Sequence, residues 1–244
     1  MSEVLKAEWF DLDDGSEAEV LEWLHGAYLP AVQASAGVGW VGHYAIVKSP
    51  ARGYIEGAPE KTETTDPTIA TGWQNVVLTA GLSSEVFFGQ DTALDALAGT
   101  HAARLSELKN YRSAVFLEEQ VVNSPEQRSS PYGMGPPPAM QLGHYNTNTP
   151  EDDIELARWY RSERFSRVSV TPGMIRGRKL LSIAGWAKHG VLWEFTDLPE
   201  GDYSFEHRFV AAARDDEWAG RHVLDYVTHG YGSPNAGRLI WPAR

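Results

Sequence analysis

One predicted helix in the second half of the sequence carries side chains that could transfer protons. At helical spacing, its core-facing line would run through Leu156, Trp159, Tyr160, Glu163 and Arg167. A carboxylate on such a line is costly to bury unless it is paired, and desolvation raises its pKa towards the range useful for acid–base catalysis. We therefore expect a polar cavity beside this helix, with Glu163 as the general acid or base.

Two guanidinium groups follow this carboxylate within about one helical turn. Arg164 and Arg167 could hold an anionic group of a substrate or polarise an oxyanion. The alternative is that the helix frays after Tyr160, or that Glu163 and Arg167 form only an i,i+4 ion pair on a solvated helix face. The sequence leaves both readings open.

Other aromatic and imidazole side chains would complete such a site. We expect Tyr160 and His144 to assist proton transfer, and Trp159 and Trp186 to contact the substrate. Tyr145 follows His144 directly, and alternation along a strand directs two successive side chains to opposite faces of a sheet. Only one of these two can therefore enter a given cavity.

Three more histidines differ in the positions predicted for them. His101 lies in the middle of the apolar stripe of a predicted helix, where a lone His is more often a satisfied core residue than a ligand. His25 lies at the flank of the apolar stripe of the first helix. His25 and His101 would both contact substrate if the first half keeps a site of its own. His189 falls in a predicted tight turn, where we expect exposure.

Motifs that bind nucleotides or metals do not occur in this sequence. There is no Walker A loop, no dinucleotide fingerprint, no His-Glu-x-x-His and no nucleophile elbow. No spacing of His and carboxylates predicts a metal site, and the lack of Cys removes thiolate ligands and disulfides. We expect neither a metal nor a cofactor.

The charge balance restricts the partners. With 33 acidic and 21 basic residues, the net charge of -12 would repel nucleic acid. No stretch approaches the roughly 20 apolar residues of a membrane span, and the segment 1–14 lacks the apolar run of a signal peptide. We expect a small-molecule substrate, no nucleic-acid or membrane partner and a cytoplasmic location; whether the chain is a homo-oligomer is open.

An internal repeat organises the chain. Four residue pairs share one offset of 136 positions, namely Glu19 with Glu155, Trp23 with Trp159, Val32 with Val168 and Gly37 with Gly173. Self-similarity at a fixed offset is the signature of repeated structural units. The chain is therefore predicted to contain two copies of one unit.

Each copy is predicted to have the element order βαββαβ, the ferredoxin-like plan of an α+β fold. The first copy has predicted strands at 4–10, 40–47, 73–78 and 111–122, and the second at 140–145, 179–186, 191–195 and within 221–241. Helices begin after Ser16, which with Glu19 would form a capping box, and after Thr149. Further helices are predicted at 91–108 and 202–213.

These elements define the domain boundaries. We expect a first repeat at 1–123, a linker rich in Ser, Pro and Gly at 124–138, and a second repeat at 139–244 that holds the active site. An insertion at 48–72 separates two strands of the first repeat. It is either a lid over a binding site or an inert surface excursion.

The arrangement resembles the dimeric α/β-barrel superfamily, and EthD-like proteins in particular. The segment Glu22–Ala31, with Trp23 and His25 and a Gly about fourteen residues after the Trp, looks like the helical Trp and His stretch of that family. In the superfamily two such sheets usually pair between subunits as a barrel. Here the two copies could pair within one chain.

The resemblance implies small, often aromatic substrates held between sheet and helices, commonly without a cofactor. Related haem proteins similar to chlorite dismutase also fuse two such units, and they carry a haem-ligating His on the first helix of the second copy. The corresponding residues here, 159–164, contain no His. This departure argues against haem.

Three functions are therefore carried forward. The leading expectation is a cofactor-independent lyase, dehydratase or isomerase that uses Glu163 on a small aromatic or carbonyl compound. The second is a cofactor-free or haem-dependent oxygenase. The third is a non-catalytic protein that binds a hydrophobic metabolite.

Overall fold

The strands of the protein are given by a computed structural model that describes residues 3–13, 15–47, 62–125, 135–198 and 226–243. The first half contains β1 (Val4–Asp11), β2 (Val38–Ile46), β3 (Asn75–Gly81) and β4 (Lys109–Asn123). The second half contains β5 (Ala139–Thr147), β6 (Met174–Ala184), β7 (His189–Phe195), β8 (Val227–His229) and β9 (Asn235–Trp241). The ladders between these strands are antiparallel.

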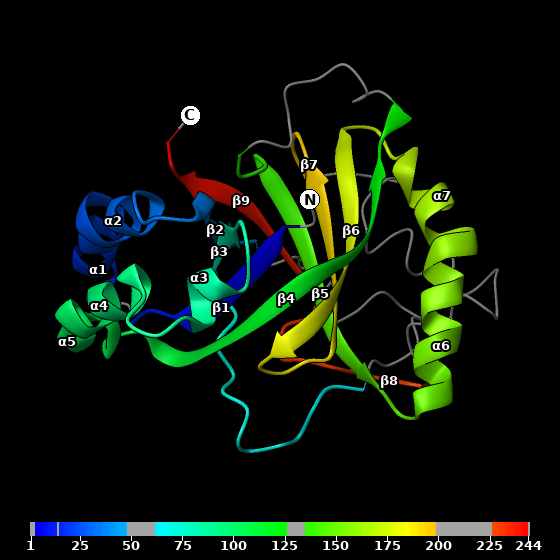
Figure 1. Cartoon of the computed structure of the whole chain (residues 1–244), viewed down its shortest axis with the longest axis horizontal. Helices are drawn as coiled ribbons and strands as arrows, with labels where there is room; N and C mark the ends of the chain where they lie inside the picture. Colours follow the sequence, from blue (N-terminus) through cyan, green and yellow to red (C-terminus); the bar gives the residue numbers. More distant parts are fainter. Residues whose placement is uncertain (1–2, 14, 48–61, 126–134, 199–225, 244) are drawn as a thin grey trace.

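The sheet closes into a barrel, which runs through the centre of Figure 1. The strand order is β7-β6-β4-β1-β3-β2-β9-β5, a pairing of β5 with β7 completes the ring, and β8 pairs with the end of β5. Within the ring, the first half has the order β4-β1-β3-β2 and the second half the equivalent order β9-β5-β7-β6. The halves join where β2 pairs with β9 and β4 with β6. The predicted α+β class is confirmed as an antiparallel α+β barrel.

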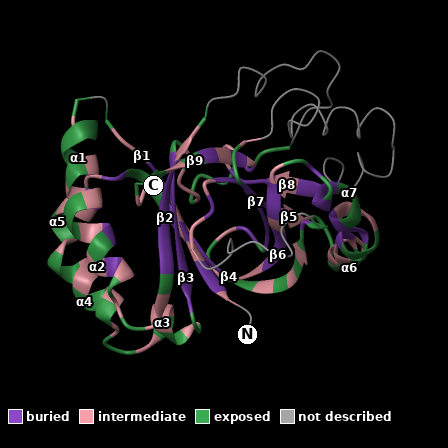
Figure 2. Ribbon diagram, turned by 90° about the horizontal axis from the view of Figure 1, so that it is seen from above, coloured by how far each residue is buried: buried purple, intermediate pink, exposed green. Residues whose placement is uncertain are grey.

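Helices cover the outer faces of the two half-barrels on opposite sides, as Figure 2 shows. The first half has α1 (Glu17–Trp23), the π-helical turn η1 (Leu24–Tyr28), α2 (Leu29–Gln33), α3 (Glu85–Phe88), α4 (Ala93–Thr100) and α5 (Ala102–Leu105). The second half has α6 (Pro150–Trp159), the π-helical turn η4 (Tyr160–Arg164) and α7 (Phe165–Ser169). In the described ranges no helix has the length and apolarity needed to cross a lipid bilayer.

The predicted strands inside the described ranges are present, although the one predicted from Lys179 begins at Met174. The predicted helix 202–213 lies outside the described residues. Thr149 caps α6 by a capping box with Asp152. The capping box predicted at Ser16 is wrong, because the Ser16 side chain makes no capping hydrogen bond and its ψ of -1° departs from the extended backbone usual at that position.

Strand alternation divides each strand between the barrel interior and the helices. In β1, Leu5, Ala7 and Trp9 point inward and join the apolar cluster of the barrel. Phe10 has the opposite parity and packs under the first-half helices with Val20 and other apolar residues. A second cluster lies between the second-half sheet and α6–α7. The barrel interior is thus a packed core, and two outer compartments lie beneath the helices.

A π-helical turn interrupts the main helix of each half at the same place. η1 and η4 lie 136 residues apart, the offset of the sequence repeat. A π-turn contains one extra residue, so the positions after it are rotated by about 100° relative to an unbroken α-helix. Gly37 and Gly173 follow these helices with φ of 83° and 75°, a left-handed conformation that Gly adopts without strain.

Two connecting segments contact strands: the predicted insertion contacts β8 of the second half, and the predicted linker contacts β2 of the first half. Glu63, in the predicted insertion, forms an isolated parallel bridge with His229, and the Thr64 amide donates to the His229 carbonyl over 2.8 Å. Residues 48–61 of the insertion lie outside the described ranges. At the end of the predicted linker, the Pro137 carbonyl accepts a hydrogen bond from the Tyr44 hydroxyl over 3.1 Å. The described parts of both segments therefore lie against the barrel.

Charged side chains fill one end of the barrel interior. Arg178 is fully buried and forms ion pairs with Glu3, Glu118 (3.3 Å) and Glu194 (2.8 Å). Arg176 also pairs with Glu194, over 2.7 Å. Three carboxylates therefore meet two guanidinium groups. Burial raises the pKa of Glu194 to about 7, with Arg178 opposing the rise and Glu3 adding to it.

The raised pKa of Glu194 predicts a stability change near neutral pH. Between its unfolded value near 4.5 and about 7, the folded state binds more protons, so this group stabilises the fold below pH 4.5 and the contribution is lost as pH rises through 7. The expected loss is on the order of 1–3 kcal/mol. Urea unfolding of wild type and Glu194→Gln at pH 5, 6, 7 and 8 measures this loss, as the change with pH in the difference between their free energies of unfolding. Glu163→Gln is the exposed control, and an equal pH dependence in wild type and Glu194→Gln would contradict the assignment.

Candidate functional site

A cavity of about 360 Å³ lies between the outer face of the first-half sheet and its helices. Its volume is in the range of small-molecule sites. Polar groups come mainly from the sheet and apolar groups mainly from the helices. The lining includes Lys6, Glu8 and Ser113 from the sheet and Tyr28, Val32 and Phe87 from the helices.

The sheet side of this cavity carries one ion pair. Lys6 and Glu8 share the outward parity of β1, opposite to inward-pointing Ala7, and their charged groups lie 2.9 Å apart. The Tyr111 hydroxyl, on neighbouring β4, donates to the same Glu8 carboxylate over 2.5 Å. The two partners orient the carboxylate at the cavity wall.

The helix side contributes a tyrosine that faces this carboxylate. Tyr28 is the last residue of η1 and lines the cavity. Burial raises the pKa of Tyr28 well above its usual value, and the negative charge of Glu8 raises it further, so the phenol stays protonated. Its ring stacks on Trp23 at 5.3 Å between centroids and meets His101 edge-on at 5.5 Å. The site therefore offers a carboxylate, an ammonium and a neutral phenol to one ligand.

Glu163 and Arg167 do not enter a cavity. They form an i,i+4 ion pair of 3.1 Å, with 41% and 58% of their side chains exposed. The expectation that both face the core is wrong because η4 rotates the following residues, and Phe165 and Val168 are buried instead. The alternative of a solvated surface pair describes the observed geometry. The general acid–base role proposed for Glu163 loses the burial on which it rested.

The other residues predicted around that helix pack in the second outer compartment. Tyr160 is buried, and its hydroxyl accepts a hydrogen bond from the Tyr145 hydroxyl over 2.9 Å. Trp159 is also buried, with its ring 5.1 Å from that of Tyr160 and the Arg164 guanidinium 5.5 Å from its centroid. The aromatic rings therefore pack against one another.

His144 and Trp186 lie at the end of the barrel opposite the ion pairs of Arg178, and His144 is fully buried. The Arg112 guanidinium lies 3.0 Å from its Nε2 and 4.3 Å from the Trp9 ring. A Cβ on Gly230 would collide with both the His144 and Trp186 rings, so these two converge on the glycine. As expected from alternation, Tyr145 lies on the opposite face, in the second outer compartment. Neither His144 nor Trp186 lines the described cavity.

The two histidines predicted in the first half do not line the cavity. His101 accepts a hydrogen bond from the Trp23 indole over 3.3 Å and touches Tyr28. His25 lies 2.9 Å from buried His43 and stacks on Trp241. His101 therefore supports a cavity-lining side chain, whereas His25 belongs to a neighbouring polar cluster.

Sequence reasoning missed the residues that form the polar wall. Lys6 and Glu8 stand two positions apart in a strand whose alternate positions are apolar, and that alternation places both on one outward face. This signal was available from the sequence. Tyr111 and Tyr28 could not be assigned to the wall in this way, because strand pairing and the π-turn bring them there.

Comparisons with known proteins show a shared fold. No family model and no curated protein sequence matches this chain. Among solved structures, it is similar to a protein provisionally named chlorite dismutase (TM-score 0.55, 12% identity, covering 98% of this chain and 95% of that one) and to an anthrone oxidase-like protein (0.55, 11%, 98% and 91%). A third is a protein from Fusobacterium nucleatum provisionally named monooxygenase (0.54, 11%, 98% and 93%). The chain therefore has the dimeric α+β-barrel fold; the EthD-like assignment stays a prediction.

The expected cofactor-independent lyase, dehydratase or isomerase is contradicted. The proteins of this fold reported above are named for oxidation, oxygenation or chlorite chemistry, and not for lyase or isomerase reactions. The residue on which that expectation depended, Glu163, lies in a surface ion pair. The second expectation, an oxygenase, agrees better with these neighbours.

The surface position of Glu163 predicts that its charge contributes little to stability. Glu163→Gln should change the free energy of unfolding by less than about 0.5 kcal/mol, because exposed i,i+4 pairs contribute only a few tenths. Urea denaturation at pH 7 measures this. A loss above about 2 kcal/mol would show that the carboxylate is buried in solution and would contradict the observed geometry.

Proposed function

We propose that the chain is an oxygenase-type oxidoreductase that binds a small, electron-rich aromatic molecule in the first-half cavity. The observation that carries the proposal is the Glu8 carboxylate, held by Lys6 and Tyr111 at the wall of a cavity whose helix side is largely apolar. The names of the structural neighbours support the reaction class. Apolar walls suit an aromatic ring, and the few polar groups orient its oxygen substituents.

The residues of the cavity can perform the proton steps of such a reaction. Glu8 accepts a proton from an acidic C–H bond of a hydroxylated or keto aromatic compound, and the Lys6 ammonium stabilises the oxygen that gains negative charge. Two electrons of the carbanion reduce dioxygen as a carbon–oxygen bond forms. The peroxide anion then takes the proton back from Glu8. Substrate and dioxygen together account for every atom of the hydroperoxide product.

Haem, which some proteins of this fold employ, does not fit the described residues. Across α6, η4 and α7 there is no His, and the facing compartment is packed by Tyr160, Phe165 and Trp193 in mutual ring contact. Among the cavity-lining residues there is no His, Cys or Met, and the raised pKa of Tyr28 disfavours a phenolate ligand. No step of the proposed reaction is therefore routed through haem.

We also propose that the two halves are fused copies, bounded as the sequence predicts at 1–123 and 139–244. The equivalent strand orders, the matched π-turns and the matched glycines of positive φ support this proposal. In this arrangement the second copy has Gln141 and Gly143 on the strand that corresponds to β1. The ion pair of the first cavity is thus not repeated.

Glu8→Gln tests the assignment of the base. It should lower kcat/KM for oxygen uptake about 10²–10⁴-fold, the range for loss of a general base, because the amide keeps the shape but cannot accept the proton. An anthrone and a hydroxyanthrone, which both have an acidic C–H bond, serve as probe substrates, with uptake followed at an oxygen electrode. Glu163→Gln, at the surface, is the matched control and should retain wild-type activity.

Ligand binding separates loss of chemistry from loss of the fold. Quenching of Trp fluorescence should give Glu8→Gln a dissociation constant within tenfold of wild type. Undiminished oxygen uptake by a correctly folded Glu8→Gln variant would reject Glu8 as the base. Saturable quenching by the probes without any oxygen uptake by wild type would instead support the binding-protein alternative.

A further inference from the structure

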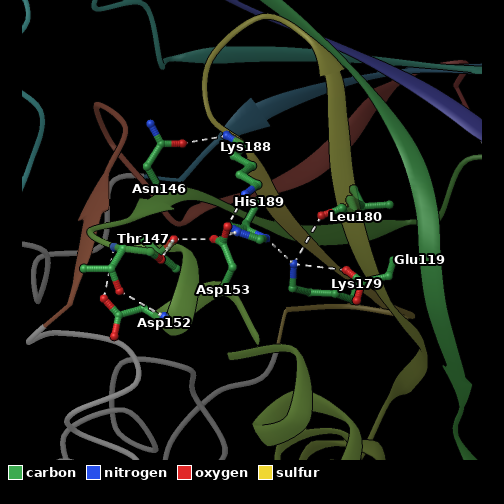
Figure 3. Close-up of polar contacts among 10 residues, drawn as sticks. Glu119, Asn146, Thr147, Asp152, Asp153, Lys179, Leu180, Lys188 and His189 are labelled. Atoms are coloured by element: carbon green, nitrogen blue, oxygen red, sulfur yellow. Dashed lines mark hydrogen bonds and ion pairs between the residues drawn. The ribbon is translucent and has the colours of Figure 1, made fainter. Parts of the chain in front are cut away.

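A hydrogen-bonded series of three titratable side chains crosses the second outer compartment. All three belong to the second half of the sequence. Lys179, on β6, is 1% exposed, and its Nζ lies 2.9 Å from Nδ1 of His189. The other ring nitrogen of His189 lies 2.6 Å from a carboxylate oxygen of Asp153. Figure 3 shows this order, carboxylate, imidazole and amine. His189, expected to be exposed in a turn, is buried at the start of β7.

Secondary structure fixes each member of this series. Lys179 pairs with Val191 and Leu181 with His189, so the Lys and His lie diagonally on the outer face of the β6–β7 ladder. Asp153 stands in the first turn of α6, whose N-terminus is fixed by the Thr149 capping box. Regular secondary structure therefore sets the positions of all three side chains.

At the Asp153 end of this series of three side chains, hydrogen bonds keep the carboxylate ionised. Partial burial alone would raise its pKa, but hydrogen bonds from Lys188, Thr147 and His189 lower that pKa to about 2. Burial, together with the charge of Lys179, lowers the pKa of His189 to about 4, so the imidazole is neutral. A neutral ring that donates its Nε2 proton to the carboxylate presents Nδ1 as an acceptor towards Lys179.

Lys179, at the other end of this series of side chains, lies among aromatic rings. The Lys179 nitrogen is 5.7 Å from the centre of the Tyr160 ring, and the Tyr145 ring stacks on His189 at 6.1 Å. Glu119 lies 3.5 Å from the same nitrogen and opposes its desolvation. Burial nonetheless lowers the pKa of Lys179 to about 8, with Glu119 working in the other direction. A substantial neutral fraction of the amine therefore exists near physiological pH.

We propose that Lys179 is a nucleophilic amine that forms an imine with an aromatic aldehyde or ketone, with His189 as its base and Asp153 as the group that orients the base. Nucleophile, base and orienting carboxylate in hydrogen-bonded sequence form the arrangement that activates enzymatic nucleophiles. The amine nitrogen bonds to the carbonyl carbon, and His189 takes one amine proton and passes it to the carbonyl oxygen, which gives the carbinolamine. His189 then takes the second proton of the nitrogen and passes it to the carbinolamine hydroxyl, and water leaves as the carbon–nitrogen double bond forms.

The corresponding cluster of the first half lacks an amine. There, His43 and Asn75 hydrogen-bond on the outer face of the adjacent strands β2 and β3, with His25 as the third member. A structural ion pair at Lys179 would need only Glu119, and the aligned His189 and Asp153 would serve no purpose in it. The aromatic surroundings favour an aromatic carbonyl compound over an aliphatic one.

Reductive trapping tests this proposal, and its outcome is independent of the oxygenase proposal because the two sites share no residue. The full chain is incubated at pH 7 with 4-hydroxybenzaldehyde and sodium cyanoborohydride, and the modified residues are located by peptide mass spectrometry. Reduction is irreversible, so label accumulates with each local opening of the compartment. Lys179 should be labelled at least tenfold faster than Lys109, which is exposed and has an ordinary ion-pair partner.

Substitutions separate activation from mere reactivity. Lys179→Met should remove the fast phase, and Lys109→Met should leave it unchanged. His189→Gln and Asp153→Asn should slow labelling of Lys179 at least tenfold while the circular dichroism spectrum is retained. Labelling of Lys179 no faster than that of Lys109, or a fast rate that survives both His189→Gln and Asp153→Asn, would overturn the proposal.

Discussion

Closure of the barrel within one chain is the constraint on which the rest of the structure depends. The pairing of β2 with β9 and of β4 with β6 joins the halves, so each of the eight ring strands has a strand neighbour on both sides. Backbone groups that would otherwise face solvent are paired, which removes the exposed edges of two open sheets. Closure also fixes which side chains face inward, and it leaves two outer faces that require helices to cover them.

The two outer compartments differ although the backbone layout around them is equivalent. The first has a cavity beside the Lys6–Glu8 pair, because small and polar side chains leave space under α2 to α4. The second is packed by aromatic rings around Tyr160 and carries a buried amine, Lys179, next to His189. The same architecture thus supports two different chemistries, because side-chain volume and charge on the outward strand positions decide what each compartment can hold.

The error over Glu163 shows where periodicity fails. A wheel with 3.6 residues per turn places Glu163 and Arg167 under Tyr160, but the π-turn inserts one residue and carries both to the surface. No local residue pattern forces that turn. Packing of Phe165 and Val168 against the sheet favours it, because burial of these apolar side chains is favourable. Burial of the charged pair would instead require desolvation of both charges. Burial of His189 likewise follows from its contact with Asp153 on α6, distant in the sequence.

The sequence by itself determined the α+β class, the strand positions and the Thr149 cap, because these follow from alternation, local capping and chain periodicity. It also contained the outward pair Lys6 and Glu8. Only the tertiary structure decided which side chains share a site, because Tyr28, Tyr111 and Glu8 meet through helix packing and strand pairing across about a hundred residues. Burial and charge pairing between distant segments set the chemistry of each group, and no local pattern encodes them.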